Sequence, residues 1–374
     1  MYDIPAGRCT GRKLPPSPPP TQSYETIGFR PFAAPVRPLD LMTELAENPA
    51  PSRPSPIYWI VSLALAGVLL YYSLRGIEWA TVWGVLKGAE PSGIAAALAI
   101  MSTALFLRSL RWRVLLSSER RMPISDVFWA TAAGYLGNNF LPARAGEFVR
   151  TVMISRRTGL SKTFVLTTAL CERVIDALAL ITIASAVLLV LPQNPGWLND
   201  AAEPLAIAGI AGVIVLSLFP LFEPFWERLL ARLPIPDRFR ERAEHFLRQG
   251  VHGLRSFHDR ARLAKYLVLT CVIWLLDGAI VVVGSKAIDA SIPLSIAFLL
   301  IAGLGLSSAL PSTPGYVGIY QFAAVTILTP FGYTQESAIA FILLFQAMTY
   351  VVFLFWGAVG IWSGSKAPAL AVAE

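Results

Sequence analysis

Long apolar stretches constrain this chain more than any other feature, because about 20 apolar residues in a helix cross the hydrocarbon core of a membrane. Six stretches are long enough for a full span: Ile57–Leu74, Ser92–Leu115, Thr163–Leu191, Pro204–Phe222, Tyr266–Ser285 and Gln335–Trp362. Hydrophobic residues make up 55% of the chain and charged residues only 15%, whereas soluble domains carry about 25% charged residues. The sequence therefore predicts an all-α polytopic membrane protein.

Two pairs of shorter apolar pieces lie between these spans. Val127–Leu141 is followed by Phe148–Ile154, and Leu294–Leu310 is followed by Val317–Leu328. A turn containing Pro and Gly, which interrupt helices, joins the two pieces of each pair. Each pair is therefore predicted to form a short helical hairpin. The hairpin either re-enters the membrane or has its turn in the aqueous loop, and the length of the pieces favours re-entrant tips.

The same short phrase occurs at both hairpins. "GYLGNNFLPARAGEFVR" at 134–150 aligns without a gap with "GLGLSSALPSTPGYVGI" at 303–319. This alignment, which sets Gly134 on Gly303 and is called the repeat register below, also superposes the second span on the fifth and the third on the sixth. Halves of about 92–191 and 264–363 thus each contain helix, hairpin and helix. One span separates the halves, which predicts an inverted repeat of the kind found in many secondary transporters. The alternative is chance matching, because Gly and Pro are common in membrane helices.

Basic residues near span ends mark the cytoplasmic side of a membrane. Arg residues precede the first span and Lys366 follows the last, so both chain ends are expected in the cytoplasm and the protein in the inner cell membrane. Residues 1–56 are rich in Pro and lack hydrophobic periodicity, which predicts a disordered cytoplasmic tail. Residues 57–363 form the predicted membrane domain, and residues 364–374 form a second tail.

The segment 223–265 links the two halves and is rich in Arg. Its apolar residues recur at helical spacing, which predicts a basic amphipathic helix on the anionic inner leaflet. The alternative is a solvated linker helix. The net charge of +7 is assigned to this surface, and no nucleic-acid partner is expected.

Charged residues inside a span are costly and mark functional sites. Glu172 and Asp176 stand one turn apart on the same face of the third span, with Arg173 beside them. An Arg at a hairpin tip suits a phosphate, which it binds through two parallel hydrogen bonds. The residues expected to bind an anionic headgroup are Arg144, Glu147, Arg150, Glu172, Arg173 and Asp176. The alternatives are a structural ion-pair cluster that only pins helices together and, for Arg150, a side chain in cytoplasmic water.

The hairpin tips supply further candidate residues, because helix ends and freed backbone groups there can bind an ion or a headgroup. These residues are Asn138, Asn139, Pro142, Gly146, Ser307, Ser308, Pro311, Pro314 and Gly315. Asp277 is a further acid inside a span and a candidate for ion coupling. The repeat register pairs it with Arg108, so the two could meet between the halves; alternatively, Arg108 is an interface anchor.

No catalytic residue, cofactor or metal ion is expected. The three Cys and three His residues show no metal-ligand or catalytic spacing. No GxxxxGK[ST] phosphate loop occurs, so ATP is not bound by that route. Transport would run downhill or couple to an ion through Glu172, Asp176 or Asp277.

The order of four motifs resembles the flippase-like membrane domain family. The motifs are "RWRVLL", "GYLGNNFLPARAGEFVR", "ERVIDALAL" and "LPSTPGYVGIYQFAAV". This family includes the membrane region of lysylphosphatidylglycerol synthase/flippases, UPF0104-like proteins, and relatives linked to hopanoid and archaeal glycolipid pathways. The resemblance covers roughly Ile57 to Trp362 and implies translocation of a lipid or lipid-linked headgroup. The matching polar positions are Arg144, Glu147, Glu172, Arg173 and Asp176. The soluble aminoacyl-transfer domain of the synthases does not occur in this sequence, so lysyl-lipid synthesis is not expected.

The function expected from the sequence is therefore the flipping of an anionic lipid or lipid-linked headgroup by a secondary-transporter-like mechanism, without enzymatic activity. Membrane lipids are the expected partners, and lipid-pathway enzymes and a second copy of the chain are further candidates. The alternatives are an integral membrane enzyme acting on lipid phosphates and a non-transporting partner subunit of a lipid-biosynthesis complex.

Overall fold

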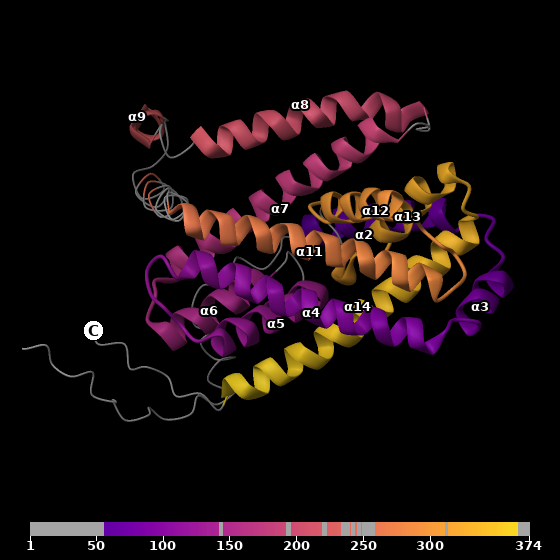
Figure 1. The fold of residues 1–374 in the computed structure, drawn as a ribbon, viewed down its shortest axis with the longest axis horizontal. Coiled ribbons are helices and arrows are strands. Elements are labelled where there is room, and N and C mark those ends of the chain that lie inside the picture. Colours follow the sequence, from indigo (N-terminus) through magenta and orange to yellow (C-terminus); the bar gives the residue numbers. More distant parts are fainter. Residues whose placement is uncertain are drawn as a thin grey trace, which may run out of the picture. The chain divides into compact units, whose positions relative to one another are not determined.

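The computed structural model describes residues 56–141, 145–191, 196–218, 223–232, 259–310 and 313–365, together with positions 240, 244 and 248. Every regular element in these ranges is a helix, as predicted (Figure 1). The longer elements are α2 (Pro56–Leu74), α4 (Pro91–Leu116), α7 (Lys162–Val190), α8 (Gly196–Leu218), α11 (Arg260–Lys286) and α14 (Gln335–Ser365). The shorter ones are α3 (Trp79–Lys87), α5 (Ile124–Phe140), α6 (Gly146–Thr158), α9 (Glu223–Arg232), α12 (Leu294–Ser307), η4 (Pro314–Tyr316), α13 (Ile319–Leu328) and η5 (Thr329–Phe331).

Some predicted features lie outside the described residues. They are Pro142, Arg144 and Pro311, nearly all of both predicted tails and most of the predicted amphipathic linker helix.

Five helices are each long and apolar enough to cross a membrane, namely α4, α7, α8, α11 and α14. A sixth candidate span consists of α2 and α3, which pass the same test together but are bent by 86°. The sequence predicted a single helix here and missed α3. Gly76 lies between the two helices with a φ of 81°, a left-handed conformation that glycine adopts without steric cost. The chain is thus a multi-pass membrane protein.

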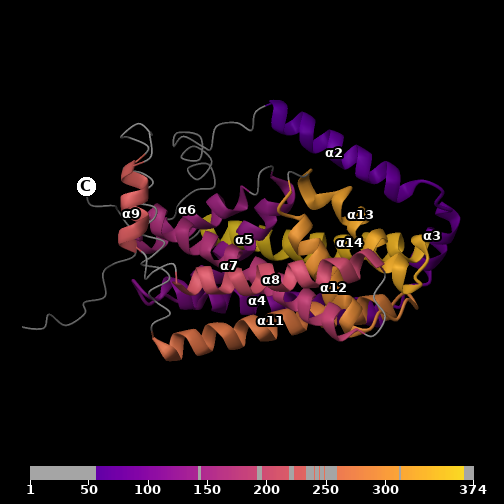
Figure 2. The same ribbon diagram turned by 90° about the horizontal axis from the view of Figure 1, so that it is seen from above.

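The helices of the two halves correspond closely. In the repeat register α4 corresponds to 260–285, and α11 is Arg260–Lys286. Helix contacts also come in matching pairs: α5 packs on α14 while α12 packs on α7, and the hairpin α5–α6 matches the hairpin α12–α13. The span between the halves, α8, packs along α7 (Figures 1 and 2).

The first helices of the two halves, α4 and α11, pack side by side and run antiparallel (Figure 1). The backbone N–H of Glu90, before α4, donates to the carbonyl of Ala287, after α11, at 2.7 Å. Towards the other end, Arg111 of α4 lies over the ring of Tyr266, near the start of α11. An antiparallel crossing is what a twofold axis between inverted halves would produce. The inverted layout across a membrane stays a prediction.

Cysteine labelling tests that layout. Arg121, after α4, and Ala290, after α11, occupy matching positions in the repeat register. In a chain with its native cysteines replaced, Arg121→Cys and Ala290→Cys are expected to react with a membrane-impermeant maleimide from opposite faces of the membrane. Labelling of both positions from the same face would rule out the inverted repeat.

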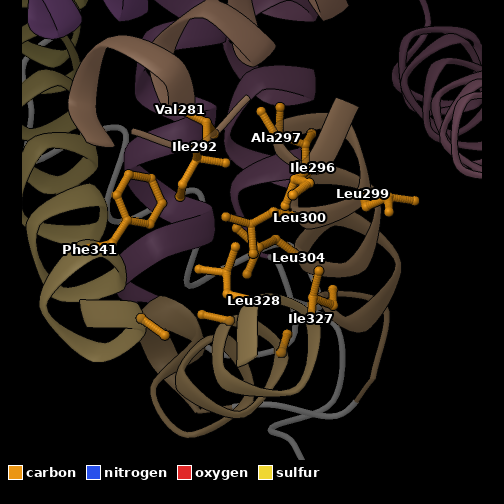
Figure 3. Packing of buried hydrophobic residues seen from close by; sticks show 14 of the residues in the cluster. Val281, Ile292, Ile296, Ala297, Leu299, Leu300, Leu304, Ile327, Leu328 and Phe341 are labelled. Carbon is orange, nitrogen blue, oxygen red and sulfur yellow. The ribbon is translucent and has the colours of Figure 1, made fainter. Parts of the chain in front are cut away.

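The second hairpin packs in an apolar core. Leu300 and Leu304 of α12 lie against Ile327 and Leu328 of α13, with Phe341 of α14 nearby (Figure 3). In the repeat register Phe341 and its neighbour Ile342 match Glu172 and Arg173, and both apolar side chains are fully buried. The second half thus has apolar side chains at positions where the first half carries charge.

Candidate functional site

A cluster of eight charged side chains lies between α4, α6, α7 and α11. Its members are Arg108 and Arg111 on α4, Glu147 and Arg150 on α6, Glu172, Arg173 and Asp176 on α7, and Asp277 on α11. Four are arginines and four are acids, so the charges of the described cluster balance when all eight are ionised. The structure brings together five of the six residues predicted to bind a headgroup; the sixth, Arg144, lies outside the described residues.

Arg111 joins α4 to α7 at the centre of the cluster. Its Nη2 donates to Glu172 Oε1 at 2.9 Å, and its Nη1 and Nη2 donate to the two carboxylate oxygens of Asp176 at 2.7 and 2.9 Å. One guanidinium can reach both acids because they stand one turn apart on the same face of α7, as the sequence predicted. The Arg111 guanidinium also lies 5.4 Å from the ring centroid of Tyr266, within cation–π range.

Arg150 joins α6 to the same acid of α7. Its Nη1 donates to Glu172 Oε2 at 3.0 Å and its Nε to Glu147 Oε2 at 2.6 Å. Its guanidinium lies 4.5 Å from the ring centroid of Trp112. The alternative of an Arg150 side chain in cytoplasmic water is wrong, because this side chain is only 2% exposed. Glu172 therefore bridges two buried arginines.

Glycines in the repeated phrase let α6 approach α5 closely enough to place Glu147 and Arg150 in the cluster. A Cβ at Gly146 would lie 1.8 Å from the carbonyl oxygen of Gly134, and one at Gly137 would lie 2.8 Å from Gly146 Cα. In the second half, a Cβ at Gly303 would lie 2.2 Å from the Ile327 side chain of the facing hairpin helix. Gly137 and Gly146 are thus required for close helix packing, because the atoms they approach belong to the backbone, whereas the Ile327 side chain facing Gly303 can move.

The charged cluster has a closed end and an open end. Side-chain exposure is 8% or less for Arg111, Glu147, Arg150 and Glu172, whereas it is 12% for Asp277, 14% for Asp176, 19% for Arg108 and 28% for Arg173. The first four residues form the closed end and the other four, which are the more accessible, form the open end.

Two arginines at the open end lie against the same aromatic ring. The guanidinium of Arg173 is 5.4 Å from the ring centroid of Tyr135 on α5, and that of Arg108 is 6.0 Å away. Arg173 donates through Nε to Glu147 Oε1 at 3.0 Å. Its terminal nitrogens make longer contacts, 3.4 Å to the Tyr135 hydroxyl and 3.8 Å to Asp176 Oδ2. Contacts of that length are weak, so these nitrogens can donate to an anionic ligand.

The ends of the two hairpins meet near this site. η4, at the second tip, packs against α5. The carbonyl of Gly315 accepts hydrogen bonds from Gln346 Nε2 at 2.9 Å and from the Tyr350 hydroxyl at 3.1 Å. The Tyr350 ring in turn lies 5.8 Å from that of Phe140, at the end of α5. Neutral groups therefore hold the second tip, in contrast with the charged first hairpin.

The other predicted tip residues make mostly local contacts. Asn139 donates to the carbonyl of Tyr135, Ser307 to that of Leu304 and Ser308 to that of Gly305. Pro314 opens η4, and Gly315 follows with a φ of 72°. Asn138 differs, because its amide donates to Glu147 Oε1 at 3.1 Å and so joins the tip to the charged cluster.

The contact between Arg108 and Asp277 is confirmed: the two side chains form an ion pair between α4 and α11. Arg111, Tyr135, Trp112 and Tyr266 were missed as site residues. The position of Arg111, three residues after Arg108 and on the same helical face, could have indicated a second inward-facing arginine.

Among the described residues, no group of three or more His, Cys, Asp or Glu side chains is placed to hold a metal ion. The geometry instead offers guanidinium groups beside a tyrosine ring, which suits a ligand with anionic oxygens.

Comparisons with known proteins place the chain in a family. The sequence profile described as "Lysylphosphatidylglycerol synthase TM region" matches residues 59–357, which is more than half of the chain. The glycosyltransferase AglD of Haloferax volcanii is 26% identical over 328 residues, covering 79% of this chain and 52% of AglD. The chain thus spans about half the length of that relative.

Two further relatives carry membrane-protein names. A UPF0104 membrane protein of Methanothermobacter thermautotrophicus is 24% identical over 289 residues, covering 71% of this chain and 82% of that protein. A UPF0104 membrane protein of Methanocaldococcus jannaschii is 21% identical over 223 residues, covering 59% of this chain and 91% of that protein. Together with the matched profile, these similarities show that the chain belongs to the family of the lysylphosphatidylglycerol synthase transmembrane region.

Proposed function

We propose that this protein moves lipids with an anionic, phosphate-bearing headgroup between the two leaflets of the inner cell membrane, with both chain ends in the cytoplasm and without chemical change to the lipid. One observation carries the proposal: a charged cluster lies among apolar, span-length helices and is open at Arg108 and Arg173, near the point where the two hairpins meet. Secondary transporters place their substrate sites at such a junction of repeats and broken helices.

The open end suits a phosphate. A headgroup that enters an apolar membrane loses its water and needs replacement hydrogen bonds. Arg173 can supply them through its terminal nitrogens, which make only long contacts to Tyr135 and Asp176. Guanidinium groups bind phosphate oxygens through paired, charge-assisted hydrogen bonds. Membership of a family described by the membrane region of a phospholipid synthase supports a lipid as the ligand.

Loss of Arg173 is expected to slow translocation. In liposomes that contain fluorescent phosphatidylglycerol, wild-type protein should expose inner-leaflet probe to an external quencher faster than protein-free liposomes do. Arg173→Ala should reduce this rate by about tenfold or more, because a hydrogen bond to a charged group contributes about 1.5–3 kcal/mol. Arg173→Lys keeps the charge but not the paired geometry and should give an intermediate rate.

Arg121→Ala is the matched control, because it removes the same charge from an exposed position and should leave the rate unchanged. Equal rates for wild type and Arg173→Ala, with both proteins folded, would reject the site. Equal rates for wild type and protein-free liposomes would reject translocation of this lipid. Mass spectrometry of the recovered lipid separates transport from enzymatic conversion, since transport leaves the lipid mass unchanged.

A further inference from the structure

We infer that Asp277 takes up a proton when a lipid phosphate binds Arg108, so that headgroup binding at the open end is coupled to protonation. The inference rests on the proposed function for the identity of the ligand. It adds Arg108 to the residues that bind the headgroup and names the proton as the coupled ion.

The ion pair of Arg108 and Asp277 is suited to exchange. Arg108 Nη2 donates to Asp277 Oδ2, and both side chains are partly exposed. The buried pairs at the closed end are different, because Glu172 contacts both Arg111 and Arg150 and would leave two arginines behind. Removing one partner of a fully buried pair is strongly unfavourable, whereas Arg108 and Asp277 are less buried, and an anion that replaces Asp277 leaves no second arginine without its acid. The Arg108–Asp277 pair, which is the easier one to exchange, therefore lies at the open end of the cluster.

A phosphate can take the place of Asp277 on Arg108. Phosphate and carboxylate oxygens bind guanidinium in the same paired geometry. Since Arg108 and Arg173 both lie against the ring of Tyr135, one phosphate beside this ring can contact both. Tyr135 is then a positioning residue for the two arginines.

Charge balance supplies the reason for proton uptake. The described cluster contains four arginines and four acids, and a phosphodiester adds one negative charge. The displaced Asp277 carboxylate would then be ionised without its partner among apolar helices, which is unfavourable. Binding of one proton from solvent converts the carboxylate to a neutral carboxylic acid and restores the balance, and no bond of the lipid breaks.

The charged groups around Asp277 indicate that Arg108, and not Arg111, exchanges its carboxylate partner for the phosphate. Arg108 and Arg111 of α4 and Asp176 of α7 act on Asp277 electrostatically, and Arg111 is already paired with two acids. Of the other helices that pack on α11, α12 contains no titratable side chain. The titratable residues of α14 are Glu336, in its first turn, and Tyr350, which is bonded to Gly315.

The test measures binding of fluorescent phosphatidylglycerol to the purified full chain in detergent as a function of pH. If one proton is taken up per lipid, wild-type affinity should fall by up to about tenfold for each unit that the pH rises. Asp277→Asn resembles the protonated acid. At every pH it should therefore bind the lipid as tightly as wild type does at the lowest pH. Arg108→Gln should bind the lipid weakly at every pH. The control Asp200→Asn, at an exposed position on α8, should keep the wild-type slope.

A wild-type slope in Asp277→Asn, or no slope in wild type, would overturn the inference. Proton uptake by wild type in weakly buffered solution, expected at about one proton per bound lipid by the same linkage, needs no variant and so does not depend on the folding of Asp277→Asn. Inorganic phosphate alone should bind more weakly than the lipid. If inorganic phosphate bound as tightly as the lipid, the inference that the ligand is a lipid would be wrong.

The translocation assay separates this inference from the proposed function. Proton-linked binding without lipid movement would leave the inference standing and reject transport. Lipid movement together with pH-independent binding would leave transport standing and reject the inference.

Discussion

Arg111→Met is expected to lower the free energy of unfolding by about 3–5 kcal/mol, because removal of one partner leaves buried charges uncompensated. Arg111 is 1% exposed and pairs with both Glu172 and Asp176. Met matches the length of the Arg stem but leaves Glu172 with Arg150 alone and Asp176 with only the long contact to Arg173. This loss is a large fraction of the stability of a typical domain.

Thermal unfolding in detergent measures this effect. Arg121→Met, at an exposed position after α4, is the control and should lie within about 0.5 kcal/mol of wild type. The double variant Arg111→Met/Asp176→Asn should recover part of the loss, because the carboxylate that loses its short ion pair is neutralised together with its partner. A wild-type unfolding temperature for Arg111→Met would show that the charged cluster does not hold α4 against α7.

Gly146→Ala is expected to have the next largest effect on stability. Its Cβ would lie 1.8 Å from the carbonyl oxygen of Gly134 and 2.6 Å from the backbone nitrogen of Asn138. Because the obstacles are backbone atoms, no rotamer change relieves them and α6 must move away from α5. Overpacking of this kind costs about 3 kcal/mol or more at its upper end. The shift would also displace Glu147 and Arg150, so lipid translocation should fall as well.

Gly67→Ala is the matched control, since a Cβ there meets nothing within 4 Å. Ala is the better helix former by about 1 kcal/mol, so this variant should unfold at or above the wild-type temperature and transport normally. Normal stability and transport in Gly146→Ala would show that the close crossing of the hairpin arms is not required.

Much of the fold could be predicted because a membrane protein displays its helices as long apolar stretches. α4, α7 and α14 begin and end within about three residues of the predicted spans, and α11 begins six residues before its predicted span and ends one residue after it. The pairing of Glu172 and Asp176 on one face followed from helical spacing, which is local. The contact of Arg108 with Asp277 followed from the repeat, which is long-range information carried by the sequence itself.

The remaining features depend on how helices approach one another, and no local pattern records that. Arg111 carries the same charge as the arginines that follow it, and only the packing of α4 against α7 turns it inward to Glu172. Tyr135 belongs to the first phrase of the repeat, but its place beside Arg108 and Arg173 depends on three helices. Gly146 was predicted as a turn former and Gly134 only as a matching position of the repeat, whereas both permit contact between helix backbones.

At the antiparallel crossing of α4 and α11, two positions that match in the repeat register contact each other. Arg108 of the first half pairs with Asp277 of the second. Two copies of the first half, docked in the same way, would set arginine against arginine, and two copies of the second would set aspartate against aspartate. Like charges placed together in this way cost several kcal/mol. Two copies of the same half therefore repel each other at this position, whereas the two different halves attract. The charges at this single position therefore favour pairing of the first half with the second. A protein cut between the halves should reassemble as a heterodimer and not as a homodimer of either piece.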